Sequence, residues 1–390
     1  MKKKIKVAHI ITRLIVGGAQ ENTISTVTGL MKNPHYDVTL LSGPEIGPEG
    51  TLRDKAMGKG VNLIIISQLR RNLNPVRDLL AVTQLIIHFM KNRYDIIHTH
   101  SSKAGIIARI SAFLTGCPVI IHTIHGLPFH PYQSKWRNIL YIFLEKICAK
   151  ITDKIITVSD TMRDKALEKK IGEKELYTTI YSGMDIDSFA NCSKHRNQMR
   201  QELKIKPDEL VVGKIARLFD LKGHDFVIDC AKEISKNIPN VKFLFVGDGI
   251  LKDKLIEKIH SLGMDEKFIF TGLVAPEKIP PCISCMDILV HASLREGLAR
   301  ALPQAMAAGL PIVAIDVDSA HEMAIDNKTG FLIPSNDQKM FVQAVIKLLR
   351  DKKLRSTLGQ NGKKMVIEMF KTTFMVNKIE TLYEDLIICG

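Results

Sequence analysis

Residues 288–315 read ILVHASLREGLARALPQAMAAGLPIVAI, and the fold class can be argued outward from this stretch. An apolar run at 288–290 leads into a polar loop, a helical segment of small residues, and a second apolar run at 312–315. Runs that are apolar throughout are typical of parallel strands buried on both faces. The stretch therefore predicts a strand, a crossover helix and a second parallel strand, the unit from which α/β domains are built.

The same rhythm of short apolar runs and longer amphipathic helical stretches occupies both halves of the 390 residues. This length suits two domains of about 200 residues each. We expect an α/β protein made of two Rossmann-like doubly wound parallel-sheet domains that face each other across a cleft. The predicted strands lie at 6–11, 38–41, 96–98, 119–121 and 155–158, and then at 211–215, 242–246, 268–270, 288–290 and 312–315.

A domain boundary is predicted near the turn at residues 181–185, which a polar, strand-poor stretch follows up to about Pro207. The first domain then covers 1–185 and the second 186–369. The last segment, about 370–390, is a long amphipathic helix that no strand follows.

The net charge of +14 is concentrated in the first half of the chain. Residues 1–185 carry 26 Lys and Arg against 15 Asp and Glu, whereas residues 186–390 carry 29 against 26. A basic surface attracts an anionic partner, such as a membrane, a nucleic acid or a phosphorylated substrate. Nucleic-acid motifs are absent and there is one Trp, so a membrane surface or a lipid phosphate is the favoured partner.

The seven cysteines are an odd number spread along a long chain, which predicts reduced thiols. Cys282 and Cys285 have CxxC spacing without a second pair, which favours two buried helix residues over a zinc site. No apolar run reaches the about 18 residues of a spanning helix, and the basic start lacks the features of a signal peptide. We therefore expect a cytoplasmic protein.

In each half of the chain, a glycine-containing loop follows the first predicted strand. Gly17 and Gly18 stand directly before a helical pattern, where a backbone can approach an anion; a plain tight turn is the alternative. Arg217, Lys222 and Gly223 lie between a strand and a helix, where the two cations could hold a diphosphate. A solvated loop would contain the same residue types.

Three further positions lie at predicted strand ends. Gly247 belongs to a strand–glycine–helix turn that fits close approach to a ligand or a structural turn equally well. Glu296 is predicted at a helix N-terminus, either to accept sugar hydroxyls or to cap the helix. His125 follows a strand of the first half, where a histidine is either structural or part of a site.

Taken in order, these segments resemble the family-4 glycosyltransferases of the GT-B fold, and the resemblance extends over essentially the whole chain. Each segment alone is a weak signal, but the ordered set is specific. The matching segments are Gly17-Gly18, His125-Gly126, Val158-Ser159, Ser182 to Asp185, Arg217 with Lys222-Gly223, Val246 to Gly249, Glu296-Gly297 and Gly330 to Pro334.

The resemblance implies a retaining, metal-independent hexosyltransferase that needs no cofactor beyond its nucleotide diphosphate sugar donor, linked to UDP or GDP. The C-terminal domain would bind the donor and the N-terminal domain the acceptor, a glycan or a lipid-linked sugar of cell-envelope polysaccharide or glycolipid synthesis. The last helix would cross back to the first domain.

The resemblance also implies a role for each site residue. Arg217 and Lys222 would neutralise the diphosphate leaving group, Glu296 would bind the sugar hydroxyls, and His125 would stabilise developing charge at the reaction centre. The departing phosphate would help to deprotonate the acceptor. The remaining donor-binding positions would be Gly17, Gly18, Gly247, Gly297, Leu298, Gln304 and Glu322.

Two positions depart from the family pattern. The usual Glu-x7-Glu motif is Glu296 followed by Gln304, which can still bond ribose hydroxyls but carries no charge. Asp318, Ser319 and Ala320 stand where the family often has a Gly-Gly turn before the position of Glu322.

The segment from Lys135 to Leu144 combines two cations, the single Trp and an apolar run. It fits either an interfacial helix or a buried helix at the wall of the cleft. The first alternative, with the basic first half, gives the hypothesis of peripheral attachment to the inner face of the cell membrane.

Two other functions remain compatible with the same architecture. A hydrolysing nucleotide-sugar 2-epimerase would release free nucleotide without an acceptor, although the Glu-Gly block before Gly309 and Pro311 is not expected in it. A non-catalytic nucleotide-sugar binding protein is the third reading, against which the presence of Arg217, Lys222, Glu296 and His125 argues.

Overall fold

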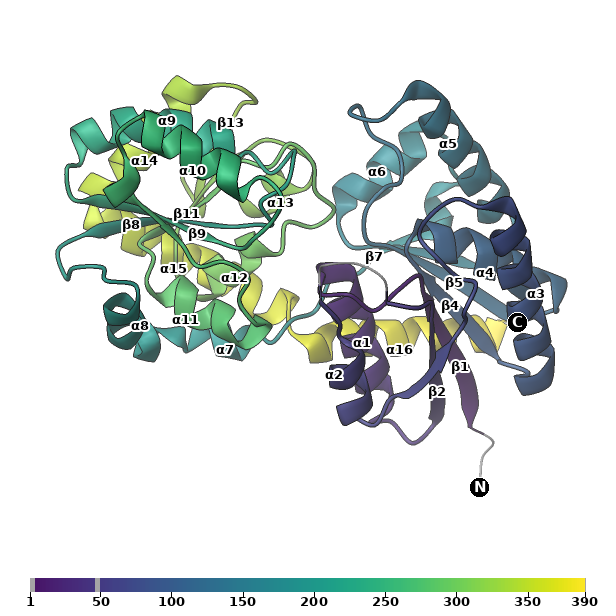
Figure 1. The fold of residues 1–390 in the computed structure, drawn as a ribbon. Coiled ribbons are helices and arrows are strands. Elements are labelled where there is room, and N and C mark those ends of the chain that lie inside the picture. Colours follow the sequence, from purple (N-terminus) through teal and green to yellow (C-terminus); the bar gives the residue numbers. More distant parts are fainter. Residues whose placement is uncertain (1–3, 46–49, 390) are drawn as a thin grey trace. The chain divides into compact units, whose positions relative to one another are not determined.

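The computed structural model describes residues 4–45 and 50–389. The chain forms two compact units, one made of Met1–Met184 with Lys371–Gly390 and the other of Asp185–Phe370. Each unit contains one wholly parallel sheet with helices on both faces (Figure 1). The α/β class and the two doubly wound sheets predicted from the sequence are confirmed.

The first unit has a seven-stranded sheet in the order β3-β2-β1-β4-β5-β6-β7. The order reverses direction between β1 and β4, so the carboxyl ends of these two strands form the topological switch point of the sheet. Its strands are β1 (Ile5–Ile11), β2 (Tyr36–Ser42), β3 (Asn62–Ile65), β4 (Ile96–His100), β5 (Val119–Ile124), β6 (Lys154–Thr157) and β7 (Tyr177–Thr179).

Helices cover both faces of this sheet. One face buries the apolar sides of α1 and α16 against the strands, and the other buries those of α3 and α4. The helices of this unit are α1 (Gly18–Leu30), α2 (Arg53–Gly58), α3 (Pro75–Asn92), α4 (Ser102–Leu114), α5 (Lys135–Ala149), α6 (Asp160–Glu168), α16 (Thr372–Cys389) and the short 3₁₀ helix η1 (Lys174–Leu176).

The last helix, α16, belongs to the core of the first unit although it is separated from it in sequence by the whole second unit (Figure 1). Val376, Ile379 and Tyr383 are buried among the residues of α1 and the strands. A Cβ on Gly29 of α1 would lie 2.3 Å from a methyl carbon of Val376, so glycine is what allows the two helices to approach.

The second unit has a six-stranded sheet in the order β10-β9-β8-β11-β12-β13, with its switch point between β8 and β11. The strands are β8 (Leu210–Ile215), β9 (Val241–Val246), β10 (Phe268–Phe270), β11 (Ile288–His291), β12 (Ile312–Ile315) and β13 (Gly330–Ile333). The helices are α7 (Ile186–Ala190), α8 (Arg196–Glu202), α9 (His224–Asn237), α10 (Lys252–Ser261), α11 (Ile279–Ser284), α12 (Ala301–Ala307), α13 (Ala320–Met323), α14 (Gln338–Arg350), α15 (Lys352–Met369) and the 3₁₀ helices η2 (Cys192–His195), η3 (Asp265–Lys267) and η4 (Pro276–Lys278).

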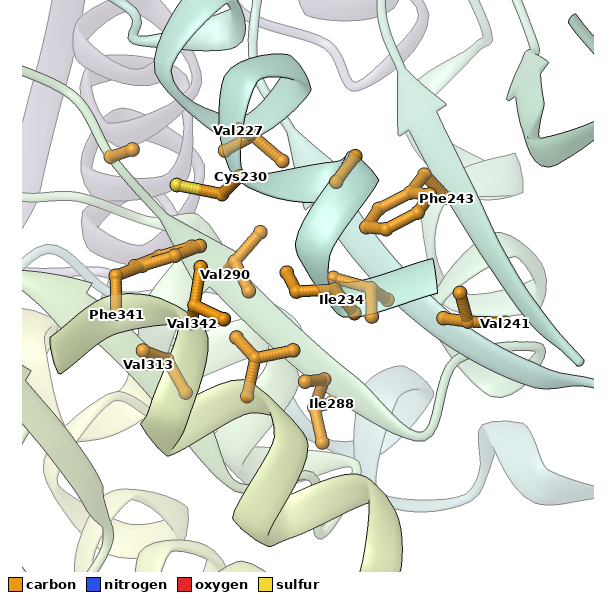
Figure 2. Packing of buried hydrophobic residues seen from close by; sticks show 14 of the residues in the cluster. Val227, Cys230, Ile234, Val241, Phe243, Ile288, Val290, Val313, Phe341 and Val342 are labelled. Atoms are coloured by element: carbon orange, nitrogen blue, oxygen red, sulfur yellow. The ribbon is translucent and has the colours of Figure 1, made fainter. Parts of the chain in front are cut away.

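Side chains from α9 and α14 meet the apolar strands in the core of this unit. Figure 2 shows Val227, Cys230 and Ile234 of α9 around the same centre as Phe341 of α14 and Val290 of β11. These residues are at most 2% exposed, so close packing holds the two helices against the sheet. The ends of the strands are followed by loops.

Local capping residues set several helix starts. Asn74 accepts a hydrogen bond from the N–H of Arg77 at 3.0 Å, and Pro75 occupies the first turn of α3. Asp337 and Asp351 accept from the N–H groups three residues ahead at the starts of α14 and α15. These helices therefore begin where their sequences supply an oxygen for the unpaired N–H groups.

The stretch at 186–207 contains no strand, as expected, and is helical at α7, η2 and α8. The sequence analysis did not identify β3, β7 and β13 as strands. Cys282 and Cys285 are buried free thiols on and just after α11, as the structural reading of the CxxC predicts. Within the described residues no helix has both the length and the apolar content needed to span a bilayer.

Candidate active site

The predicted site residues of the second unit follow β8 and β11, the two strands at its switch point. Lys222 lies in the loop after β8, and its Nζ is 2.7 Å from Oε1 of Glu296 in the loop after β11. Nε2 of His291, the last residue of β11, is 3.7 Å from the same oxygen. The fold thus brings together a cation and a carboxylate that are 74 positions apart, at the strand ends where α/β sheets bind ligands.

Glu296 does not sit at a helix N-terminus, because α12 begins only at Ala301. Its backbone N–H donates to the carboxylate of Asp318 at 2.6 Å, and the Ser319 hydroxyl donates to the carbonyl of Gly297 at 2.8 Å. The loop after β12 therefore holds the loop that carries Glu296. The helix-capping explanation of this carboxylate is excluded.

Asp318 has a φ of 52°, in the left-handed region that favours glycine. This is the position where the family often has a Gly-Gly turn. The chain keeps the turn and uses the aspartate carboxylate to accept the Glu296 N–H, which compensates for the unfavourable backbone conformation.

Gly223 and Gly247 allow the strand-end loops to pack tightly. Gly223 has a φ of 67°, and a Cβ there would lie 1.9 Å from the carbonyl oxygen of Ala292. Gly247 has a φ of 141°, and a Cβ would lie 2.2 Å from the carbonyl oxygen of Ala216. Both glycines are therefore required by close backbone approach, and Gly223 places Lys222 beside the loop that follows β11.

Burial shifts the pKa values of the titratable side chains at these strand ends. Burial is the largest single effect on the pKa of Glu296 and raises it, but the charge and hydrogen bond of Lys222 together with the neighbouring His291 bring the pKa below its usual value. Burial lowers the pKa of His291 to about 4, so this ring is neutral near pH 7. Glu296 is therefore an anion that accepts hydrogen bonds, held by one cation and flanked by a neutral imidazole.

The remaining predicted residues of this unit occupy different surroundings. Arg217 is exposed just beyond β8, with its guanidinium 5.0 Å from the centre of the Phe219 ring. Leu298 is buried, and Gln304 and Glu322 are half-buried on α12 and α13. Lys222 and Glu296 are therefore the two predicted polar residues of this unit whose hydrogen bond to each other defines the site.

The first unit carries the other predicted residues. Gly17 is the residue before α1, beyond the end of β1, and its φ of 175° is ordinary extended backbone. His125 follows β5 and is half-buried, with its Nε2 3.0 Å from Nδ1 of His100. Gly18 is exposed at the first position of α1. These residues lie in the segments that follow β1 and β5.

The sequence analysis missed Lys214, whose charge interacts with those of Lys222 and Glu296. It lies on β8, is 1% exposed, and its Nζ has no hydrogen-bond partner among the described residues. Burial, and to a smaller extent the charge of Lys222, lower its pKa to about 7. The available signal was a lysine inside the apolar run at 211–215.

Replacing Lys214 by methionine is expected to stabilise the protein most below pH 7. The unfolded lysine keeps its proton up to its ordinary pKa of about 10.4, so wild-type stability rises with pH above about 7 by up to about 1.4 kcal/mol per pH unit. Melting curves from pH 6 to 10 should show Lys214→Met above wild type at pH 6 and the two converging near pH 10. A difference in melting temperature that is the same at every pH would contradict a buried Lys214 with a lowered pKa.

Two family profiles and several known proteins match this chain. The profile described as "Glycosyltransferase Family 4" matches residues 16–188, and "Glycosyl transferases group 1" matches residues 195–365. A UDP-Gal:alpha-D-GlcNAc-diphosphoundecaprenol alpha-1,3-galactosyltransferase of Escherichia coli is 29% identical over 99% of this chain and 98% of its own. The capsular polysaccharide glycosyltransferase CapM of Staphylococcus aureus is 26% identical over 81% and 83%.

Solved structures share the fold over nearly the full length. Anabaena HepE in complex with UDP-glucose superposes with a TM-score of 0.83 at 20% identity, covering 98% of this chain and all of that one. A sucrose-phosphate synthase of Thermosynechococcus elongatus gives 0.83 at 18% identity, over 99% and 100%. The two doubly wound units have the GT-B fold, and the two profiles, which cover residues 16–188 and 195–365, identify a glycosyltransferase. The chain belongs to family 4 of these enzymes.

Proposed function

We propose that this glycosyltransferase moves a hexose from a nucleoside diphosphate donor to a lipid-linked or glycan acceptor in cell-envelope polysaccharide synthesis, with retention of anomeric configuration. The observation that carries the proposal is the Lys222–Glu296 pair at the β8/β11 switch point. It places a cation for phosphate and a carboxylate for hydroxyls 2.7 Å apart, which suits the junction of a diphosphate and a sugar.

The donor would lie along the strand ends of the second unit. Lys222 and the exposed guanidinium of Arg217 would neutralise the diphosphate as negative charge builds on the leaving group. Glu296 would accept the sugar hydroxyls, and the backbone N–H groups at Gly297 and Leu298 would donate to phosphate oxygens. No metal is needed in this scheme because the two side-chain cations supply the charge.

The other assignments complete the proposed site. Gln304 would contact the ribose, and Gly247 and Glu322 would contribute to donor binding from the neighbouring loops. Gly17 and Gly18 would offer the backbone at the switch point of the first unit to a phosphate. His125 would stabilise charge at the reaction centre, while the departing phosphate would take the proton of the acceptor hydroxyl.

Support for the donor and the acceptor comes from the relatives. The Escherichia coli protein is named for UDP-galactose and for an acceptor on diphosphoundecaprenol, and HepE has been solved with UDP-glucose. A UDP-linked hexose and a polyprenol diphosphate acceptor are therefore the first substrates to test; GDP-linked donors are the second choice.

The test is product formation in EDTA with a panel of UDP- and GDP-hexoses and a GlcNAc-diphosphopolyprenol acceptor. We expect one donor to be consumed only when acceptor is present, and the anomeric proton coupling of the product to match that of the donor. Inversion, or a requirement for added metal, would contradict the proposed mechanism. Nucleotide release without acceptor would instead support the epimerase.

The acceptor also implies attachment to a membrane, for which the first unit has a suitable surface. On α5, Trp136, Ile139 and Phe143 are 59%, 68% and 59% exposed, so this helix is not the buried one that the sequence also allowed. These residues recur at helical spacing on one side of α5 and are flanked by exposed Lys135 and Arg137.

A second helix of this unit, α3, also exposes apolar side chains, and it packs against the same helix, α4, as α5 does. Val76, Leu79, Leu80, Ile87 and Met90 of α3 are between 47% and 69% exposed. Exposed apolar side chains near cations suit a bilayer with anionic headgroups. We propose that the enzyme is cytoplasmic and binds the inner face of the cell membrane through α3 and α5.

Replacing Phe143 by aspartate is expected to reduce sedimentation with phosphatidylglycerol vesicles at low salt by about tenfold or more, since an apolar anchor becomes an anion. Leu273 is 63% exposed in the second unit, so Leu273→Asp is the matched control and should bind as wild type does. Failure of the wild type to sediment, or an equal loss in both variants, would contradict this membrane surface.

A further inference from the structure

A continuous chain of six side chains runs through the core of the first unit. Each neighbouring pair lies within hydrogen-bond distance. The contacts are Thr123 Oγ1–His98 Nε2 at 2.6 Å, His98 Nδ1–Tyr383 hydroxyl at 2.6 Å, Tyr383 hydroxyl–His9 Nε2 at 3.3 Å, His9 Nδ1–His100 Nε2 at 2.9 Å and His100 Nδ1–His125 Nε2 at 3.0 Å.

The parallel register explains why these residues meet. His9 of β1 lies directly opposite His98 of β4, and His100 is two residues further along β4, on the same face. His100 in turn lies opposite Thr123 of β5. Tyr383 of α16 covers this face, with its ring edge-on to that of His98 at 5.9 Å between centroids.

The inner members of the chain are neutral. Burial lowers the pKa of His9 to about 3 and lowers those of His98 and His100 well below the usual value. Burial raises the pKa of the Tyr383 hydroxyl well above its usual value. A neutral imidazole has one donor and one acceptor nitrogen, so each ring passes on the direction of the hydrogen bond that it receives.

Thr123 sets this direction. The Thr123 side chain is buried, and its hydroxyl has His98 Nε2 as its one hydrogen-bond partner among the described residues, so its proton goes there. His98 then donates from Nδ1 to Tyr383, and Tyr383 donates to His9 Nε2. The same step repeats at His9 and His100, so each of the three rings carries its proton on Nδ1.

We propose that this chain makes His125 an acceptor at Nε2 and leaves its own proton on Nδ1, with Tyr383 as the positioning residue. His125 can then donate a hydrogen bond to an oxygen that gains negative charge, but its Nε2 cannot take a proton from a hydroxyl. The functional half of this inference rests on the proposed function; the tautomers do not.

The same cluster could be read as a metal site. One ring nitrogen each from His9, His98 and His100 lies within 4.8 Å of the others. Both nitrogens of all three rings are already engaged with each other, Tyr383, Thr123 or His125. A divalent ion would also be buried among neutral ligands without a counter-charge, which is costly. The hydrogen-bonded chain is therefore the reading that the geometry favours.

The direct test is long-range ¹H–¹⁵N correlation of the full protein labelled with ¹⁵N-histidine, together with metal analysis of the purified protein. We expect His9, His98 and His100 to show the Nδ1–H pattern at pH 7. Protonated Nε2 on any of the three rings, or a stoichiometric metal, would overturn the chain. This readout does not depend on activity, so it stands even if no sugar transfer is found.

Variants of Thr123 and Tyr383 test the consequence for His125. Thr123→Val removes the donor that sets the direction and should give mixed tautomers and a kcat lower by about tenfold or more, with donor KM unchanged. Thr123→Ser keeps the hydroxyl and should restore both. Tyr383→Phe should decouple His9 and His100 from His98 and lower kcat similarly.

Tyr36→Phe is the matched control. Tyr36 is buried, its ring is edge-on to that of Tyr383 at 6.0 Å, and its hydroxyl has no hydrogen-bond partner among the described residues. Its loss should change neither tautomers nor kcat. Wild-type kcat in both Tyr383→Phe and Thr123→Val would overturn the positioning role, whereas a wild type inactive with every donor would overturn the proposed function and leave the tautomer result intact.

Discussion

Lys222→Met should lower the rate of sugar transfer by about 10²–10³-fold, because removing one preorganised donor to a developing negative charge typically has this effect. Lys222 lies in the loop after β8, and its Nζ is 2.7 Å from Oε1 of Glu296. Glu296→Gln keeps the volume of the side chain but loses its charge, and we expect a comparable loss. The measurement is kcat/KM with the best donor in EDTA.

The fold should survive both changes, because neither side chain belongs to the apolar core of the second unit. Lys252 pairs with Asp248 at 3.6 Å nearby, with both side chains more than a third exposed, so Lys252→Met is the control and should retain wild-type kcat/KM. Unfolded Lys222→Met protein, or near-normal activity in it, would show that the pair is structural and not part of the reaction.

The second large effect is expected on stability. Arg109 of α4 and Glu145 of α5 form an ion pair at 2.6 Å with side chains 0% and 5% exposed. Glu145→Leu leaves the guanidinium buried without its counter-charge, which should cost about 3–5 kcal/mol. For a unit of this size the melting temperature should fall by about 10 °C, measured by calorimetry.

A double variant separates the loss of the partner from the loss of packing. Arg109→Met combined with Glu145→Leu removes both charges and should recover most of the melting temperature. Asp164→Asn breaks the exposed pair with Arg163 on α6 and should cost at most about 1 kcal/mol. An unchanged melting temperature in Glu145→Leu would contradict the buried pair that fixes α5, the proposed membrane helix, against α4.

The sheet architecture could be predicted because the central strands are mostly apolar runs separated by helical stretches. The run at 312–315 is fully buried between helices. Its four consecutive apolar residues are enough to predict a strand that is buried on both faces. Strand β7 reads YTT at 177–179, which is not an apolar run, so the pattern is missing there. The loop that carries Glu296 was extended into a helix wrongly, because its small residues have the same propensity on both sides of Ala301.

The candidate site could be predicted only where a motif marks it. Lys222 stands beside Gly223, which the strand-end turn requires, and Glu296 stands in the Glu-Gly block, so each left a recognisable signature. The histidine chain did not, because His9, His98 and Tyr383 come from three distant segments and meet only through the parallel register and the packing of α16. Asp318 was identified as a departure, but its hydrogen bond to Glu296 depends on a backbone conformation that the sequence does not reveal.

The central claim is that the strand ends of the second unit bind a nucleoside diphosphate through Lys222 and Glu296 without metal. Titration calorimetry of the full chain with UDP and GDP in EDTA tests it most directly, with Lys222→Met and Lys252→Met beside the wild type. We predict saturable binding of one nucleotide to the wild type and to Lys252→Met, and binding weaker by about tenfold or more in Lys222→Met. No binding to the wild type, or equal affinity in all three proteins, would contradict the account.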